Sequence, residues 1–206
     1  MALPGRLSAF LGAAYAKPLL VLLGMAPALN LIAMAATDAL GPNPAEALIR
    51  STGDWTMRLL CIALSVTPLR VAIGLPVLAR YRRMAGLLLY LYATLHLLTY
   101  AWLDHGFGLG EIVKDVIKRP FITVGILAFV LLTPMAFTSF DAAARRLGGY
   151  IWRQLHRAVF AVAGLALLHF FWMRSGKHDY AEVAIYALIL GALIGWRLLR
   201  AVSRRY

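Results

Sequence analysis

The sequence is poor in cysteine, in acidic residues and in charge of any kind. Cys61 is the only cysteine among 206 residues, so no disulfide forms within the chain and no CxxC metal or redox pair is present. Charged residues make up only 15% of the chain, and Asp and Glu together number 9. These scarcities exclude a disordered chain, a disulfide-stapled secreted module and a coiled coil.

Hydrophobic residues take the place of the missing charge. They make up 62% of the chain, whereas a soluble domain is about 45–50% apolar, and the mean hydropathy is +0.75. The excess indicates a bilayer environment. The net charge of +12 would suggest nucleic-acid binding in a soluble protein, but cytoplasmic loops of membrane proteins carry the same excess. We therefore predict a membrane protein with a lipid environment and no nucleic-acid partner.

Six stretches are long and apolar enough to cross about 30 Å of hydrocarbon, which takes about 20 residues. They run over residues 18–36, 55–75, 84–103, 120–138, 150–173 and 180–199. The first stretch ends in small residues as a cleavable signal does, but a signal core has about 7–15 residues, so we expect an uncleaved helix. The connections are short and no tandem repeat interrupts the chain. The predicted fold is an all-α integral membrane bundle of six transmembrane helices, in one domain over residues 1–206.

The distribution of Lys and Arg predicts the orientation. If the N-terminus is cytoplasmic, that side collects fourteen of the 21 basic residues, with Asp141 as its only acid. The opposite side then holds the other eight acids and seven basic residues: Arg50, Arg58, Lys114, Lys118, Arg119, Arg174 and Lys177. The positive-inside rule selects two cytoplasmic termini. The tryptophans lie near the predicted span ends, where interfacial aromatics are common: Trp55, Trp102, Trp152, Trp172 and Trp196.

Three of the five histidines lie within predicted spans. His105 and His178 follow span ends and are expected to be solvated loop residues. His96, His156 and His169 are intramembrane ionisable residues, which are rare and by default functional. The alternative is that each donates one interhelical hydrogen bond.

Depth distinguishes the three intramembrane histidines. His96 and His169 fall in the outer halves of the third and fifth spans, and His156 falls near the inner edge. Two imidazoles at matching depth suit axial ligation of a b-type haem. His156 and His169 are 13 residues apart, which on a helix corresponds to a rise of about 20 Å and a rotation of about 140°. The rise suits two haems stacked across a membrane, but the rotation places the two side chains on different faces unless the helix tilts or bends. Zinc is a weaker alternative, because no carboxylate lies in these two spans.

The sequence offers no soluble redox module. Residues 106–110 are glycine-rich, but no strand precedes them, so we interpret them as a turn and not as a dinucleotide-binding motif. Electrons then come from a separate reductase or from a membrane quinol. Arg82 and Arg83 belong to a basic cluster that is expected to anchor anionic lipid, and contacts to haem propionates or a flavin phosphate are the alternative.

Several segments resemble the MsrQ (YedZ) family: residues 93–100, 119–125, 136–139, 147–156 and 168–172. These are haem-binding membrane subunits of bacterial periplasmic protein-methionine-sulfoxide reductase systems, within the wider ferric-reductase-like transmembrane family. The resemblance implies an inner-membrane protein with haem b, one or two copies, and FMN. It implies electron transfer from the quinone pool to a soluble molybdoenzyme, MsrP, with His96, His156 and His169 as haem ligands.

One departure from the related NADPH oxidases concerns the inner haem. Those proteins carry a histidine about 13 residues before the ligand of the third span, whereas Arg82 and Arg83 stand there in this chain. An inner haem on His156 would lack a matching histidine, which leaves one haem, an asymmetric second haem or a shared ligand. A cytosolic flavin reductase is an alternative electron donor. Alternative functions are a transmembrane ferric reductase and a non-redox metal- or proton-coupled transporter.

Overall fold

A computed structural model describes residues 3–176 and 178–203, and every regular element in these ranges is a helix. Six helical stretches are long and apolar enough to cross a membrane, which confirms the predicted number. The chain is therefore an all-α membrane protein. Lys177, Arg204 and Arg205, which enter the charge distribution above, lie outside the described residues.

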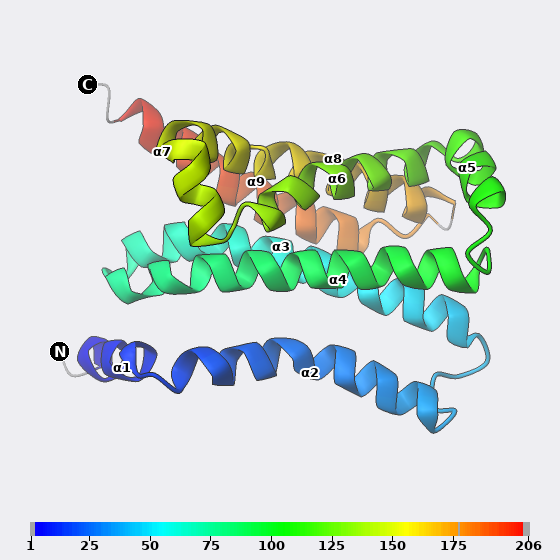
Figure 1. The fold of residues 1–206 in the computed structure, drawn as a ribbon, viewed down its shortest axis with the longest axis horizontal. Helices are drawn as coiled ribbons and strands as arrows, with labels where there is room; N and C mark the ends of the chain where they lie inside the picture. Colours follow the sequence, from blue (N-terminus) through cyan, green and yellow to red (C-terminus); the bar gives the residue numbers. More distant parts are fainter. Residues whose placement is uncertain (1–2, 177, 204–206) are drawn as a thin grey trace. The chain divides into compact units, whose positions relative to one another are not determined.

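The helices follow one another with short connections (Figure 1). In chain order they are α1 (Leu3–Gly12), α2 (Ala16–Ala36), α3 (Pro44–Ala72), the 3₁₀ helix η1 (Pro76–Tyr81), α4 (Arg82–Leu103), α5 (Leu109–Lys118), α6 (Pro120–Phe137), α7 (Asp141–Arg157), α8 (Val159–Ser175) and α9 (Ala181–Val202). Residue contacts divide the chain into two compact units, Met1–Thr99 and Tyr100–Tyr206. The division falls within α4, whose last turn belongs to the second unit.

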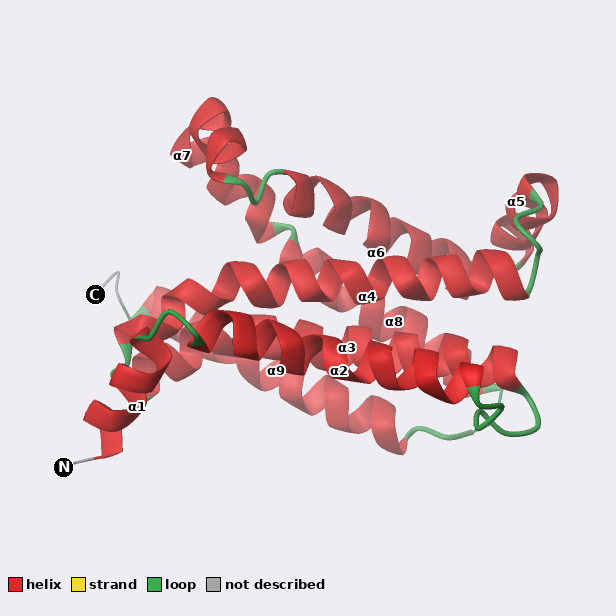
Figure 2. Ribbon diagram, turned by 60° about the horizontal axis from the view of Figure 1, so that its bottom comes forward, coloured by secondary structure: helices red, strands yellow, loops and turns green. Residues whose placement is uncertain are grey.

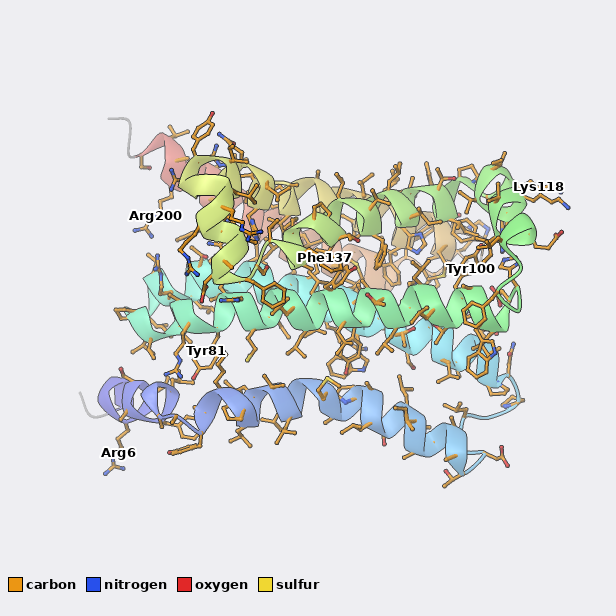
Figure 3. The ribbon with its side chains drawn as sticks, in the orientation of Figure 1. Arg6, Tyr81, Tyr100, Lys118, Phe137 and Arg200 are labelled. Atoms are coloured by element: carbon orange, nitrogen blue, oxygen red, sulfur yellow. The ribbon has the colours of Figure 1, made fainter. Side chains whose placement is uncertain are left out.

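In the first unit, α3 runs antiparallel to α2 and α4 (Figures 1 and 2). Apolar side chains of α3 and α4 are buried there, among them Leu60 and Leu89. At the end that carries α1, the Tyr81 hydroxyl donates to the Leu11 carbonyl at 2.5 Å, and Arg80 donates to the Gly12 carbonyl at 2.8 Å. Figure 3 labels Tyr81 on the side of η1 that faces α1. These bonds join η1, which leads into α4, to the N-terminal helix.

The backbone of α2 is opened at one point by a proline. Pro27 has no N–H to donate to the Leu23 carbonyl, four residues earlier. The next N–H, of Ala28, donates to the Tyr92 hydroxyl at 3.0 Å, and this hydroxyl donates to the Gly24 carbonyl at 2.8 Å. Tyr92 is fully buried. A side chain from α4 thus bridges one turn of α2 and fixes the two helices together.

The second predicted span begins too late, because α3 starts at Pro44 and not at Trp55. The Asn43 side chain accepts from the Glu46 N–H at 3.2 Å and donates to its carboxylate at 3.1 Å. This reciprocal cap, followed by proline in the first helical position, nucleates the helix before its apolar part begins. Trp55 therefore lies inside a helix and not at its start, while its place at the membrane interface stays a prediction.

In the second unit, α6 and α8 lie side by side, α9 packs on α8, and α5 and α7 lie at opposite ends of α6 (Figures 1 and 2). Arg174 fastens α8 to the chain leading into α9, because it pairs with Asp179 at 3.0 Å and Glu182 at 2.6 Å. The ring of Phe170 meets that of Tyr186 edge-on at 5.7 Å. These contacts hold α8, which carries His169, against α9, and α8 also lies beside α6.

The glycine-rich stretch after α4 begins with a turn, as predicted, but its last two residues, Leu109 and Gly110, already belong to α5. Gly106 has a φ of 51° and its N–H donates to the Trp102 carbonyl. The helix α5 that follows was not predicted, because it is too short to span. It exposes an apolar stripe formed by Leu109, Val113 and Ile117, a pattern typical of a helix lying in the membrane interface.

The fifth predicted span, residues 150–173, lies within one helical stretch, Asp141–Ser175, that is long and apolar enough to cross a membrane. The hydrogen bonding is irregular at Ala158, between α7 and α8, although the φ of −57° and ψ of −16° of this residue are helical. Before the predicted span, α7 bends at Gly148, whose φ of 73° is readily accessible only to glycine. His156 therefore lies in the last turn of α7, whereas His169 lies on α8. The expected rise of about 20 Å between the two histidines stays a prediction.

Candidate functional site

His96 projects from α4 toward α3. Its Nδ1 lies 3.0 Å from the Ile49 carbonyl oxygen, and the Thr52 hydroxyl lies 3.4 Å from the same nitrogen. The Thr52 side chain is buried and donates back to carbonyls of its own helix. The imidazole is thus positioned by the backbone of α3.

A glycine in α3 makes room for this ring. A Cβ at Gly53 would lie 3.0 Å from Cε1 and 3.3 Å from Nδ1 of His96. Carbon atoms ordinarily approach no closer than about 3.5 Å. A larger residue at Gly53 would therefore require the imidazole to shift by at least a few tenths of an ångström.

His169 is held in the same way in the second unit. Its Nδ1 lies 2.6 Å from the Phe121 carbonyl oxygen of α6. A Cβ at Gly125 would lie 2.8 Å from that nitrogen and 2.9 Å from Cε1. The rings of Phe121 and His169 lie 5.9 Å apart. The close approach of α8 to α6 at this point depends on the missing side chain of Gly125.

The two arrangements repeat each other. In both, a helix presents a carbonyl at one position and a glycine four residues later, one turn along, to a histidine from another helix. The carbonyl and the histidine are 47 residues apart in the first case and 48 in the second. We call each arrangement a histidine cradle: Ile49, Gly53 and His96 form the first, and Phe121, Gly125 and His169 form the second.

The cradles fix the tautomer of their histidines. A carbonyl oxygen only accepts, so Nδ1 has to donate, and a neutral ring then carries its lone pair on Nε2. A metal-ligating histidine is usually prepared in this way, with its second nitrogen bonded to a carbonyl or a carboxylate. Within the described residues, no three His, Cys, Asp or Glu side chains gather as a zinc site requires. Haem fits the cradles better, because the porphyrin brings its own equatorial nitrogens.

His156 is held differently. Its Nδ1 lies 3.0 Å from the Trp152 carbonyl of its own helix, and its ring stacks on the Trp152 ring at 3.9 Å with an interplanar angle of 25°. The Trp152 indole donates to the Thr138 carbonyl at 2.9 Å. Among the described glycines, none places a Cβ within 4 Å of this imidazole. His156 shares the Nδ1 bond of the other two histidines but not the cradle.

Arg82 and Arg83 begin α4, at the opposite end of that helix from His96. The side chain of Arg82 is exposed and that of Arg83 is partly buried. Their contacts with propionate or phosphate groups stay a prediction.

His105 is not the solvated residue expected from the sequence. Its Nε2 lies 3.1 Å from the Asp115 carboxylate, which also accepts from the Tyr100 hydroxyl at 2.8 Å and from Arg119 Nε at 2.6 Å. Figure 3 labels Tyr100 at the end of α4 beside α5. The Arg119 guanidinium, helped by the bonds from Tyr100 and His105, lowers the pKa of Asp115 to about 2. His178 is exposed, as predicted.

This cluster adjoins the second cradle. The Arg119 guanidinium lies over the Phe121 ring at 5.6 Å, and the Phe121 carbonyl is the acceptor for His169. The cluster therefore supports the start of α6, from which the cradle is built.

Comparisons with known proteins identify the family of this chain. Residues 52–168 match the family described as "Ferric reductase like transmembrane component". A protein of Polaromonas naphthalenivorans named "Protein-methionine-sulfoxide reductase heme-binding subunit MsrQ" is 55% identical over 183 residues, 89% of this chain and 84% of that protein.

Two further proteins of the same name are similar to this chain. The one of Ralstonia nicotianae is 50% identical over 86% of this chain and 82% of its own length. The one of Bordetella pertussis is 44% identical over 92% of this chain and 91% of its own length. No solved structure matches this chain.

Proposed function

Since this chain belongs to the MsrQ family of ferric-reductase-like transmembrane proteins, we propose that it is the haem-binding membrane subunit of a protein-methionine-sulfoxide reductase. In this role it passes electrons across the bacterial inner membrane to a periplasmic MsrP-like molybdoenzyme, which carries out the repair of oxidised proteins. The observation that carries the proposal is the pair of histidine cradles, each of which fixes Nδ1 of its histidine against a backbone carbonyl, as is usual for metal-ligating histidines.

His96 and His169 are the proposed axial ligands of haem b, and His156 is the proposed principal ligand of an inner haem. The bound haem supplies a one-electron couple at its iron. The protein contributes the tautomer and the direction of each imidazole through the Ile49 and Phe121 carbonyls. Gly53 and Gly125 keep the space into which the rings fit. FMN is a further cofactor implied by the family resemblance, with Arg82 and Arg83 as candidate phosphate contacts.

The proposed donor is a membrane quinol. The described residues form no strand and hence no βαβ unit of the kind that binds nicotinamide or flavin dinucleotides. A lipid-soluble donor reaches the spans directly from the bilayer, whereas a cytosolic flavin reductase as donor requires a second protein. We propose a single domain with both termini cytoplasmic, following the distribution of basic residues.

Absorption spectra of the detergent-purified protein test the haem. We expect a Soret band that a quinol shifts to the reduced form and that NADPH, with no other protein present, leaves unchanged. A protein expressed with ample haem and showing no Soret band would contradict the proposal and favour a non-redox transporter.

The acceptor is tested by stopped-flow reoxidation of the reduced protein. We expect rapid reoxidation by oxidised MsrP. The second candidate, a transmembrane ferric reductase, is favoured by the description of the matching family. Rapid transfer to small ferric chelates with none to MsrP would select this second candidate.

A further inference from the structure

A cavity of about 470 Å³ lies in the first unit, where α2 faces the early part of α3. Its size falls within the roughly 300–1,000 Å³ typical of small-molecule sites. Apolar side chains such as Leu23, Leu31 and Met34 form most of its lining, and no charged residue takes part. Leu23 is 59% exposed, so the cavity opens on a surface that faces hydrocarbon in a membrane. The cavity therefore suits a neutral, largely apolar molecule that enters from the bilayer.

Three polar side chains line the same cavity: Asn30 from α2, and Ser51 and Trp55 from α3. Within the described part of the chain, the Ser51 hydroxyl and the Trp55 indole N–H have no hydrogen-bond partner. Asn30 makes only a contact of 3.4 Å from its amide nitrogen to the Met34 sulfur, a weak acceptor. Polar groups without partners are costly in hydrocarbon. The three groups therefore point to a ligand that supplies hydrogen-bonding oxygens.

The cavity borders the opened turn of α2. Leu23 and Pro27, the pair whose backbone hydrogen bond is missing, both line it. Helix α2 stays continuous through Pro27, and backbone groups freed by a proline in a transmembrane helix are tolerated where they line a cavity or are bonded by other parts of the protein.

The cavity is also close to the first cradle. At about 100° per residue, Ser51 and Trp55 lie on the opposite face of α3 from Gly53. The cavity and His96 are therefore separated by the thickness of one helix, about 10 Å. A ligand in the cavity is held within the membrane and next to a proposed haem ligand.

We propose that this cavity binds the ring of a lipid-soluble quinone or quinol, with its oxygens bonded by Asn30, Ser51 and Trp55 and its tail extending past Leu23 into the bilayer. The choice of a redox-active ring rests on the proposed function. The uncharged lining disfavours a phospholipid headgroup, which carries a phosphate. Hydroxyl and amide groups both donate and accept, so they suit the carbonyls of a quinone and the hydroxyls of a quinol alike.

Binding of decylubiquinone to the purified full-length protein, measured by calorimetry, tests the site. Asn30→Leu should raise the Kd roughly tenfold, the effect of losing one good hydrogen bond, and Ser51→Ala should raise it severalfold. Ser65→Ala is the matched control, because Ser65 is on α3 outside the cavity and bonds the Ile62 carbonyl. Its Kd should equal that of the wild type. Soret absorbance, recorded on every sample, should be the same in all variants.

Unchanged affinity in both cavity variants, or no quinone binding by the wild type, would overturn the proposal. So would equal displacement of the quinone by stoichiometric phospholipid, which would identify a lipid site. Quinone binding that is weakened by Asn30→Leu in a protein without a Soret band would support the cavity while contradicting the haem proposal.

Discussion

Replacing Gly125 by alanine tests whether the second cradle holds His169 as described. The added methyl would lie 2.8 Å from the imidazole Nδ1, well inside the usual contact distance of about 3.5–4.0 Å. Overpacking of this kind costs about 1–3 kcal/mol, and loss of the bond to the Phe121 carbonyl adds about 0.5–1.5 kcal/mol. Alanine in a helix returns at most about 1 kcal/mol. We expect a net destabilisation of about 1–3 kcal/mol and a turned imidazole.

The consequence for haem is the sharper result. A turned ring presents Nε2 in another direction, so the haem-to-protein ratio of purified Gly125→Ala should fall severalfold, and the low-spin EPR signal of any remaining haem should shift. Gly53→Ala should have a milder effect, because its methyl would lie 3.0 Å from Cε1 of His96.

Gly164→Ala is the control for both variants. It is a helical glycine with nothing within 4 Å of the added methyl, so its haem content and EPR signal should match the wild type and its stability should rise slightly. Equal haem content and equal EPR signals in Gly125→Ala and Gly164→Ala would refute the cradle.

Three further outcomes are expected. His96→Ala or His169→Ala should each lose most of the haem, measured as the haem-to-protein ratio, because an axial bond is removed; normal haem in both would eliminate them as ligands. Since the folded-state pKa of Asp115 is lowered to about 2, its stabilising effect is present above about pH 4 and is lost as the pH falls toward 2. The thermal midpoint of Asp115→Asn should therefore lie below that of wild type at pH 6 and converge with it near pH 2; a constant difference would show that ionisation is not involved. Alkaline phosphatase fused after Lys118 should be active and a fusion after Arg80 inactive, with the reverse pattern inverting the orientation.

Hydropathy predicts the spans because each needs only enough apolar length, and it finds all six. Hydropathy misses the ends and extensions of helices that are determined by polar capping residues. The cap formed by Asn43 and Glu46 extends α3, and the Asn-Pro sequence at its start was a readable sign. The bend at Gly148 depends on backbone dihedrals that no apolar pattern encodes.

The sequence identifies the three intramembrane histidines because ionisable residues are rare in membrane spans, but it does not predict the residues that surround them. Gly53 and Gly125 act by having no side chain, and their partners, the carbonyls of Ile49 and Phe121, belong to no particular residue type. Such features become visible only when two helices are placed together. The nearly equal sequence separation of glycine and histidine in the two cradles was the one signal available. His105 was misjudged because Asp115, its partner, lies in a helix too short for the spanning criterion.

The division of the chain within α4 has a consequence for biosynthesis. Every residue of the first cradle precedes Tyr100, and every residue of the second follows it. Membrane chains are made from the N-terminus, and folding units generally form in that order. The residues of the first cradle are therefore all translated before Phe121, the first residue of the second. Because its contacts lie within the first unit, the first cradle needs no residue of the second unit in order to form.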